Sequence, residues 1–545
     1  MAKEHAHLGV SLGTHLSDVE AALVALGQRD VMGRIWRKDN TVWKPDPAEI
    51  TNRLGWLTVT DLMYEQVPAL ESFAQEIRGA GFRSVVLLGM GGSSLGPEVL
   101  RQTFGSAAGY PELIVLDSIV PAWVQSVIEA IDPAHTLFLV SSKSGTTIEP
   151  LFLLPYFRSL VEAAIGKEQA GQNFVAVTDP GTPLARLAEE QGFRRIFLNP
   201  PDIGGRYSVL SYFGLVPAVL IGVDITALLE RADYMREGCA SSVPVYENPG
   251  AWLGTAMGTL ALRGRDKLTL ITSPAISSFG LWVEQLIAES TGKEGKGIIP
   301  VAGEPLLEPA HYSDDRLFIY LRLEGDDNSA IDVAVEGIKS SGQPVLVLEM
   351  RDRYALGAEF FRWEFATAVV GVILGINPFD QPNVQQAKEA TERVLQEYLT
   401  SGRLPQVEAA HSLGDLLADA GKGKYLAIMA YLRQTPEVDR VLTDLRRKVV
   451  ERYYITTTFG YGPRFLHSTG QLHKGGPDTG LFLQVTADHE KDLSIPGKPY
   501  TFGIVADAQA LGDLQALQSA GRRVIRIHLS QGGETAIRQL ASQLE

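Results

Sequence analysis

The chain has 545 residues, enough for two or three domains with buried cores. Its formal net charge of −15 disfavours a surface for nucleic acid or anionic membranes, so an anionic substrate would need a local concentration of positive charge. The single cysteine, Cys239, excludes an intramolecular disulfide and suits a reducing compartment. The N-terminus lacks a signal-peptide pattern, and no apolar stretch reaches the roughly 20 residues of a membrane span, so we expect a soluble, cytoplasmic protein.

The first third of the chain, beyond an N-terminal segment of helices and loops, alternates between strand and helix patterns. Such alternation predicts a doubly wound parallel sheet that binds ligands at the carboxyl ends of its strands. The predicted strands are Ser84–Leu88, Leu113–Leu116, Thr136–Ser141, Phe174–Val177 and Arg195–Leu198.

Two further α/β units are expected downstream. The second has predicted strands at Lys267–Ile271, Leu317–Leu321 and Val345–Leu348 and ends with a long helix, Tyr354–Gly375. The third has predicted helices at Glu437–Tyr453 and Ala508–Ala520. Its predicted strands are Tyr425–Ile428, Leu481–Val485, Thr501–Val505 and Val524–His528.

A hydroxyl-rich segment, SSKSGTTIEP at residues 141–150, lies between an apolar run and a helical pattern that extends to Ile165. A strand, a Ser/Thr/Gly loop and a helix start together present free backbone N–H groups and hydroxyls to a phosphate. An ordinary helix N-cap has a similar composition, so both interpretations stay open for this segment alone.

A glycine-rich loop, GMGGSSLGP at residues 89–97, follows the first predicted strand. Ser94 stands where the dinucleotide-binding pattern G-x-G-x-x-G requires its third glycine, which disfavours a nucleotide-dependent oxidoreductase. The backbone can still approach a ligand closely in this loop, and Ser93 can donate a hydrogen bond to it.

Three charged residues lie in or directly after recognisable motifs. Arg206 follows two glycines, and its permanent charge suits an oxyanion, although a structural ion pair is the alternative. Glu289, in WVEQLIAESTGK at residues 282–293, would serve as a general base if partly desolvated; a solvated helix-end glutamate is the alternative. Lys388 ends NPFDQPNVQQAK near a predicted helix start, where the macrodipole disfavours a lysine; a ligand anion is therefore a reasonable partner, and a solvated surface lysine is the alternative.

The strings GMGGSSLGP, SSKSGTTIE, GGRYS, AESTGK and NPFDQPNVQQAK, in this order, resemble the phosphoglucose isomerase (glucose-6-phosphate isomerase) family over residues 55–400. The N-terminal RIWRKDNTVWKPDP and the long tail are more similar to the isomerase half of bacterial transaldolase–isomerase fusions. Nothing resembles the transaldolase half, so we expect no Schiff-base lysine chemistry.

The resemblance implies an α/β fold with two doubly wound parallel-sheet sugar-isomerase domains. Each is a three-layer αβα sandwich, and a C-terminal α/β extension follows them. We expect an N-terminal segment at 1–55, the two domains at 56–236 and 237–400, and the extension at 401–545.

The resemblance also implies an activity: reversible isomerisation of glucose 6-phosphate and fructose 6-phosphate through a cis-enediolate, a step of glycolysis and gluconeogenesis. Glu289 would move the proton between C2 and C1, Arg206 would stabilise the enediolate charge, and Lys388 would be an acid in ring opening. The residues implied to bind the substrate or its phosphate are Ser93, Ser142, Lys143, Ser144, Thr147, Glu149, Gly205 and Gln381.

The family also uses a histidine for ring opening, often donated by the neighbouring subunit. Matching the string GEP at residues 303–305 to the family places His311 at that position, although its flanking residues depart from the family pattern. A homodimer is therefore expected. Residues 456–477, which include His467 and His473, allow a lid, a subunit contact, a second anion site or an ordered loop, and no mechanism follows from their sequence.

Aldose–ketose isomerisation requires a base, an acid and a charge stabiliser, but no metal and no redox cofactor. The sequence has no HExxH motif, no cysteine cluster and no convincing His/carboxylate metal set, so we expect a phosphosugar substrate and no cofactor. A non-catalytic phosphosugar-binding module and an isomerase with dual glucose and mannose 6-phosphate specificity stay open as alternatives.

Overall fold

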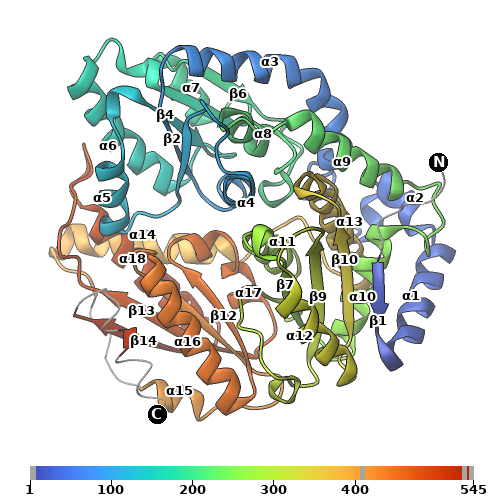
Figure 1. The fold of residues 1–545 in the computed structure, drawn as a ribbon. Helices are drawn as coiled ribbons and strands as arrows, with labels where there is room; N and C mark the ends of the chain where they lie inside the picture. The colour runs from blue at the N-terminus through green and yellow to red at the C-terminus, as the bar shows by residue number, and fades with distance from the viewer. Residues whose placement is uncertain (1–7, 406–411, 531–536, 539–545) are drawn as a thin grey trace.

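The computed structural model describes residues 8–405, 412–530 and 537–538. Three β-sheets form its framework: one in blue to cyan, one in green to yellow that also contains the dark-blue strand β1, and one in orange to red (Figure 1). Within the described part of the chain, no helix combines the length and the apolar character that crossing a membrane requires.

The first sheet is five-stranded and parallel throughout, in the order β3-β2-β4-β5-β6. Every residue of β4 is buried, as expected for a strand that is covered by helices on both faces of its sheet. All five predicted strands are confirmed within a residue at each end. The elements are β2 (Ser84–Gly89), α4 (Leu95–Phe104), β3 (Glu112–Leu116), α5 (Pro121–Ala130), β4 (Thr136–Ser141), α6 (Ile148–Ile165), β5 (Phe174–Thr178), α7 (Pro183–Glu190), β6 (Arg195–Leu198), α8 (Tyr212–Leu220) and α9 (Ile225–Gly238).

The second sheet has the order β1-β10-β9-β7-β8 and is parallel except for β1. Its three predicted strands are confirmed, and the short strand β8 lies in a segment for which none is predicted. The elements are α10 (Pro249–Leu262), β7 (Lys267–Thr272), α11 (Phe279–Thr291), β8 (Ile299–Val301), β9 (Arg316–Leu323), α12 (Ser329–Ser340), β10 (Val345–Met350) and α13 (Leu356–Leu374).

The third sheet is four-stranded and parallel, in the order β12-β11-β13-β14. We call β11 to β14, with their helices α15 to α18, the C-terminal unit. The elements are α14 (Val384–Ser401), α15 (Leu413–Leu417), β11 (Tyr425–Tyr431), α16 (Pro436–Tyr453), β12 (Thr456–Tyr461), α17 (Gly470–Gly475), β13 (Gly480–Ala487), α18 (Phe502–Ser519) and β14 (Arg523–Leu529). The expected α/β fold with parallel sheets is thereby confirmed.

The N-terminal segment is not only helix and loop. Strand β1 (Leu8–Ser11) pairs antiparallel with β10, and α1 (Leu16–Gln28), α2 (Val31–Trp36) and α3 (Val59–Gly79) follow it. The indole N–H groups of Trp36 and Trp43 donate to the carbonyl oxygens of Cys239 and Ala368, at 2.8 and 2.7 Å. These bonds attach the segment to the second unit.

The predicted strand Thr501–Val505 is wrong. Its β-branched and aromatic residues favour a strand, but Thr501 is the N-cap of α18 and its side chain accepts a hydrogen bond from the backbone N–H of Ile504. Phe502 and Val505, three residues apart, are both buried in the core below this helix. The helix therefore begins at Phe502, six residues before the predicted Ala508.

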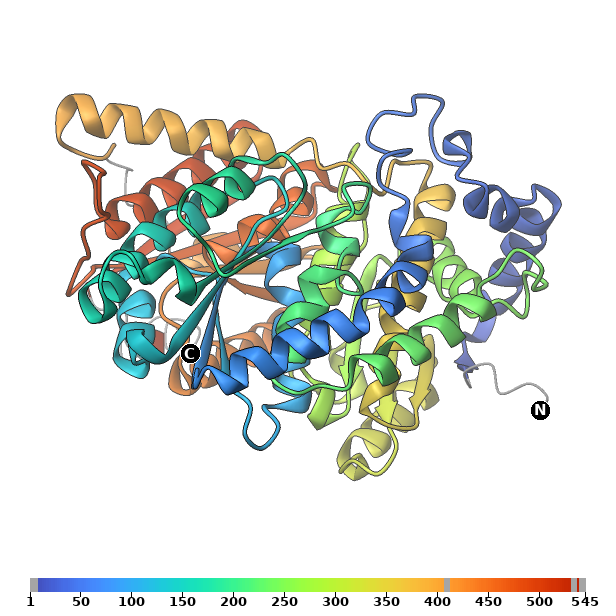
Figure 2. The ribbon, with the colours of Figure 1, turned by 90° about the horizontal axis from the view of Figure 1, so that it is seen from above.

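The C-terminal unit shares a core with the first sheet. Apolar side chains of α14 and α18 are buried in the same cluster as those of β2, β4 and α6. Tyr156 of α6 meets Phe502 of α18 edge to face, with ring centroids 5.6 Å apart. Figure 2 shows α14 running along the C-terminal unit, and the two helices α14 and α18 contact each other.

Candidate active site

The hydroxyl-rich loop lies where the first sheet reverses its strand order. Strands β3 and β4 flank β2 on opposite sides, and Gly89 at the end of β2 is paired with Ser141 at the end of β4. The loops GMGGSS and SSKSGTT therefore leave the sheet side by side, at the position where doubly wound sheets bind ligands. Helix α6 begins directly after the second loop and points its N-terminus at it.

Local hydrogen bonds fix the shape of this second loop. Ser142 and Thr147 share a hydrogen bond between their hydroxyls at 2.9 Å, and the Ser142 hydroxyl accepts from the backbone N–H of Gly145 at 3.2 Å. Gly145 has a φ of +64°, which favours glycine. The Ser144 hydroxyl accepts from Thr146, and both of these side chains are exposed. Exposed hydroxyls thus lie at the mouth of the loop.

Lys143 is directed elsewhere. Its ammonium forms an ion pair with Asp179 and donates to the carbonyl oxygen of Pro201 at 3.0 Å. Its positive charge is therefore already matched by a carboxylate beside the loop.

The first glycine loop packs against the Gly-Gly-Arg motif. A Cβ atom on Gly92 would lie 1.9 Å from the carbonyl oxygen of Gly205, so only glycine permits this approach. Ser93, 8% exposed, follows in the same loop. The two backbones together hold Arg206 at the boundary between the first and second units.

Arg206 meets the predicted base directly. Its guanidinium is buried and lies 3.4 Å from the carboxylate of Glu289, whose side chain is 12% exposed. The same guanidinium donates to the hydroxyl of Ser290 at 2.7 Å and to the side-chain oxygen of Gln381 at 2.9 Å. Four sequence-predicted residues, Gly205, Arg206, Glu289 and Gln381, are thus brought together.

Lys293 of the AESTGK string is a second cation close to Arg206. The ammonium of Lys293 lies 2.6 Å from both the backbone oxygen and the carboxylate of Asp380. Burial, together with the nearby guanidinium of Arg206, lowers the pKa of Lys293 to about 8, against the pull of Asp380. Sequence reasoning did not select Lys293, because nothing in the string distinguishes a buried lysine from a solvated one.

Glu149 is the centre of a contact that sequence reasoning missed. This buried carboxylate lies 2.8 Å from Nε2 of His467 and accepts from the side-chain amide of Gln509 at 2.7 Å. Burial opposes its ionisation, but the attraction of His467 and the hydrogen bonds from His467 and Gln509 outweigh it, so the pKa of Glu149 is lowered. Both partners belong to the C-terminal unit.

Gln285 of α11 links Glu289 to the segment that carries His467. Its amide nitrogen donates to the carboxylate of Glu289 at 3.0 Å and to the backbone oxygen of His467 at 2.9 Å. A Cβ atom on Gly91 would lie within 3 Å of both this amide nitrogen and this backbone oxygen. The loops of the first and third units and the helix of the second therefore meet around one point.

A cavity of about 430 Å³ opens beside this point. Its walls come from the hydroxyl-rich loop, from α6, from α14 and from the C-terminal unit. They include Thr146, Thr147, Glu149, Lys388, His467 and Gln509. Lys388 projects from the first turns of α14 and is exposed, so it can turn towards an anion in the cavity.

His311 lies in a short 3-10 helix, Pro309–His311, of the second unit. Its ring stacks on Tyr454, with centroids 5.9 Å apart. Among the described residues, no recorded contact joins it to Glu149, Arg206 or Glu289. A role for His311 across a subunit interface stays a prediction.

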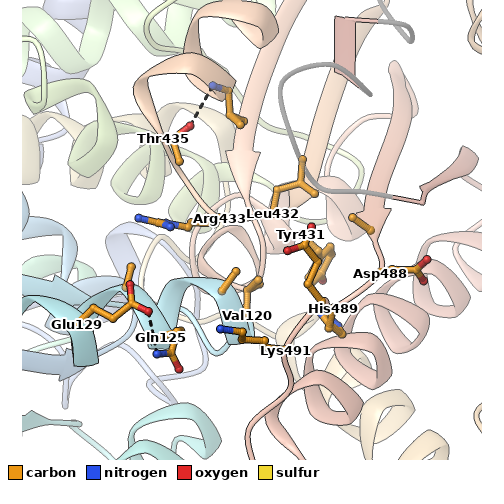
Figure 3. A pocket seen from close by; sticks show the side chains of 15 residues that line it. Val120, Gln125, Glu129, Tyr431, Leu432, Arg433, Thr435, Asp488, His489 and Lys491 are labelled. Atoms are coloured by element: carbon orange, nitrogen blue, oxygen red, sulfur yellow. Dashed lines mark hydrogen bonds between the residues drawn. The ribbon is translucent and has the colours of Figure 1, made fainter.

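A different cavity, of about 370 Å³, lies at the carboxyl ends of β11 and β13 and against α5 (Figure 3). Its lining carries both signs of charge: Arg433, His489 and Lys491 against Glu129 and Asp488. None of the predicted site residues lines it, so it is separate from the candidate active site.

Comparison with known proteins agrees with this arrangement. Residues 58–297 match the phosphoglucose isomerase family model. A glucose-6-phosphate isomerase of Symbiobacterium thermophilum is 30% identical over 384 residues, which cover 62% of this chain and 85% of that protein. One of Staphylococcus saprophyticus is 29% identical over 406 residues, covering 66% and 90% of the two chains. The chain belongs to the phosphoglucose isomerase family.

Solved structures agree at the level of the fold. A hypothetical protein of Thermus thermophilus has a TM-score of 0.61 and 26% identity, with 71% of this chain and all of that chain covered. A glucose-6-phosphate isomerase of Chlamydia trachomatis has a TM-score of 0.58 at 20% identity, with 70% and 86% covered. The similarity to transaldolase–isomerase fusions stays a prediction.

Proposed function

We propose that this protein interconverts glucose 6-phosphate and fructose 6-phosphate. The observation that carries the proposal is the buried contact between Arg206 and Glu289, 3.4 Å apart. Gln285 links Glu289 to His467, which lines a cavity together with part of the hydroxyl-rich loop. A carboxylate next to a fixed guanidinium suits proton abstraction beside a carbonyl, because the cation stabilises the negative charge that develops on the enediolate.

The proposed roles follow the placement of each group. The hydroxyls and backbone N–H groups of residues 142–147, with Ser93, bind the phosphate at the N-terminus of α6. Glu289 transfers the proton between C2 and C1, Arg206 stabilises the enediolate, and Lys388 is the acid of ring opening. We also propose that the domains end at residues 55, 236 and 400 and that the protein is a homodimer.

A coupled assay on fructose 6-phosphate tests the activity, and Glu289→Gln tests the base. The substitution keeps the shape of the side chain but removes the basic oxygen, so kcat falls by roughly 10²–10⁴-fold while substrate affinity changes little. Glu294→Gln is the matched control, because Glu294 is half-exposed on a surface ion pair with Lys44. Unchanged kcat in Glu289→Gln would contradict the assigned base. Phosphosugar binding by a wild type without turnover would identify a binding module instead.

A further inference from the structure

We propose that the C-terminal unit completes the active site within a single chain, and that its His467, held by Glu149, is the base of ring opening. The inference rests on the proposed isomerase function and extends it. It assigns a role to a part of the chain from whose sequence no mechanism follows.

The first support is the contact itself. His467 Nε2 lies 2.8 Å from the buried carboxylate of Glu149, and the His467 side chain is 18% exposed and lines the 430 Å³ cavity. Among the described residues, Nδ1 of the same ring makes no hydrogen bond. It is also absent from the buried polar atoms that lack a partner, so it is accessible rather than buried. One nitrogen is therefore oriented by a carboxylate while the other is available to a ligand.

This contact fixes which nitrogen of the imidazole faces the cavity as an acceptor. A carboxylate that accepts a hydrogen bond from one ring nitrogen fixes the orientation of the imidazole and the tautomer in which the other nitrogen carries the lone pair. The lowered pKa of Glu149 keeps the carboxylate ionised at neutral pH. Gln509 of α18 donates to the same oxygen at 2.7 Å and acts as a positioning residue.

The second support is that His467 has a fixed position. Three residues earlier, Arg464 forms a bidentate ion pair with buried Asp117 of the first unit, at 2.7 and 2.8 Å. The backbone oxygen of His467 is held by Gln285 of the second unit. Contacts to both other units therefore hold the short helix that carries the imidazole.

The third support is the extent of the chain outside its relatives. The Staphylococcus saprophyticus isomerase is matched over 90% of its own length but covers only 66% of this chain. About a third of this chain therefore lies outside that match. A histidine supplied by the C-terminal unit makes the site independent of a neighbouring subunit.

The proposed step is balanced. The C1–O5 bond of the cyclic sugar breaks and the C1 carbonyl forms. The proton on O1 passes to Nδ1 of His467, and the ammonium of Lys388, which lines the same cavity, gives a proton to O5. Solvent later returns the proton from the imidazolium to the lysine, so no external reactant is consumed.

The test compares His467→Gln with wild type in two measurements. We expect kcat/KM on glucose 6-phosphate to fall by roughly 10²–10⁴-fold. The affinity for an open-chain hydroxamate analogue, which needs no ring opening, should stay within about threefold. His489→Gln is the control, because His489 also pairs with a carboxylate, Asp507, but lines the other cavity. Wild-type kcat/KM in His467→Gln, or an equal loss of turnover and analogue affinity, would overturn the role.

A second experiment tests the single-chain site. Glu289→Gln and His467→Gln chains are co-expressed with different tags and purified together. We expect activity no greater than the sum of the two variants, because each chain then contains one defect in its own site. Recovery towards half of wild-type activity would show that the histidine crosses an interface and would overturn the inference. An inactive wild type would instead refute the proposed function.

Discussion

Arg206 shows how one side chain can serve both packing and chemistry. Its guanidinium donates to Ser290, to Gln381 and to the carbonyl oxygens of Pro378 and Asp380, and it also faces Glu289. These partners come from two separate segments of the chain. The planar fork can satisfy several of them at fixed angles, which a lysine ammonium cannot do.

Arg206→Lys should therefore keep the positive charge and still lose activity. We expect kcat to fall on the order of 10²-fold, the typical cost of losing one fixed donor to a developing oxyanion, with a smaller change in KM. Steady-state kinetics on fructose 6-phosphate measure both. Arg231→Lys is the control, since Arg231 is exposed and pairs with Asp352 at the surface. A kcat equal to that of the control would show that charge alone suffices.

Single residues also show what sequence could and could not give. The motifs were sufficient to select Arg206, Glu289 and Gln381, because each lies in a string whose order along the chain is itself informative. Glu149 and His467 are 318 residues apart, and only the folded chain shows that they touch. A histidine in a glycine-rich segment has no local pattern that reveals a buried carboxylate partner.

At the scale of an element, α11 joins catalysis to packing. It carries Glu289 near its C-terminal end and Glu284 one and a half turns earlier, where the side chain is 8% exposed. Burial raises the pKa of Glu284 to about 8, although Arg446 and Arg464 lie near enough to lower it. The folded protein therefore holds a proton on Glu284 that the unfolded chain releases near its ordinary pKa of 4.5.

Glu284→Gln should change how stability depends on pH. Since the folded state binds the extra proton, the wild type loses stability as pH rises from about 4.5 to about 8, whereas the neutral glutamine does not. Above pH 8 we expect the variant to be more stable by roughly 3–5 kcal/mol, at about 1.4 kcal/mol per tenfold change in acid dissociation. Urea unfolding at pH 5 and pH 8.5 measures this, with exposed Glu168→Gln as control. Parallel pH profiles for wild type and Glu284→Gln would contradict the assignment.

Elements were predictable where one signal dominated. Strand β4 has an apolar centre, LFLV at residues 137–140, and helix α16 has an apolar stripe at helical spacing, so the sequence predicts both. Strand β12, TTTFGY, was not separated from the glycine-rich segment that follows it. Strand β1 is four residues long and is defined by its pairing with β10, which lies more than 330 residues away.

At the scale of the whole molecule, the three units are joined by buried polar contacts. Arg446 of the C-terminal unit donates to the carbonyl oxygens of Ala302 and Gly303 in the second unit. Arg464 forms its ion pair with Asp117 of the first unit, and Asp117 is fully buried. These contacts, with the shared core under α18, favour unfolding of the units together.

Asp117→Asn tests this coupling. The substitution leaves the guanidinium of Arg464 buried without its carboxylate, and breaking a buried ion pair in this way costs about 3–5 kcal/mol. We expect calorimetry to show one transition in the wild type and a lower melting temperature in the variant. A drop in kcat should accompany it, because Arg464 precedes His467 by three residues. Asp352→Asn, at an exposed ion pair, is the control and should change neither quantity. A wild type that melts in separate steps, or a variant that melts and turns over as the control does, would show that the C-terminal unit is not held in place by this contact.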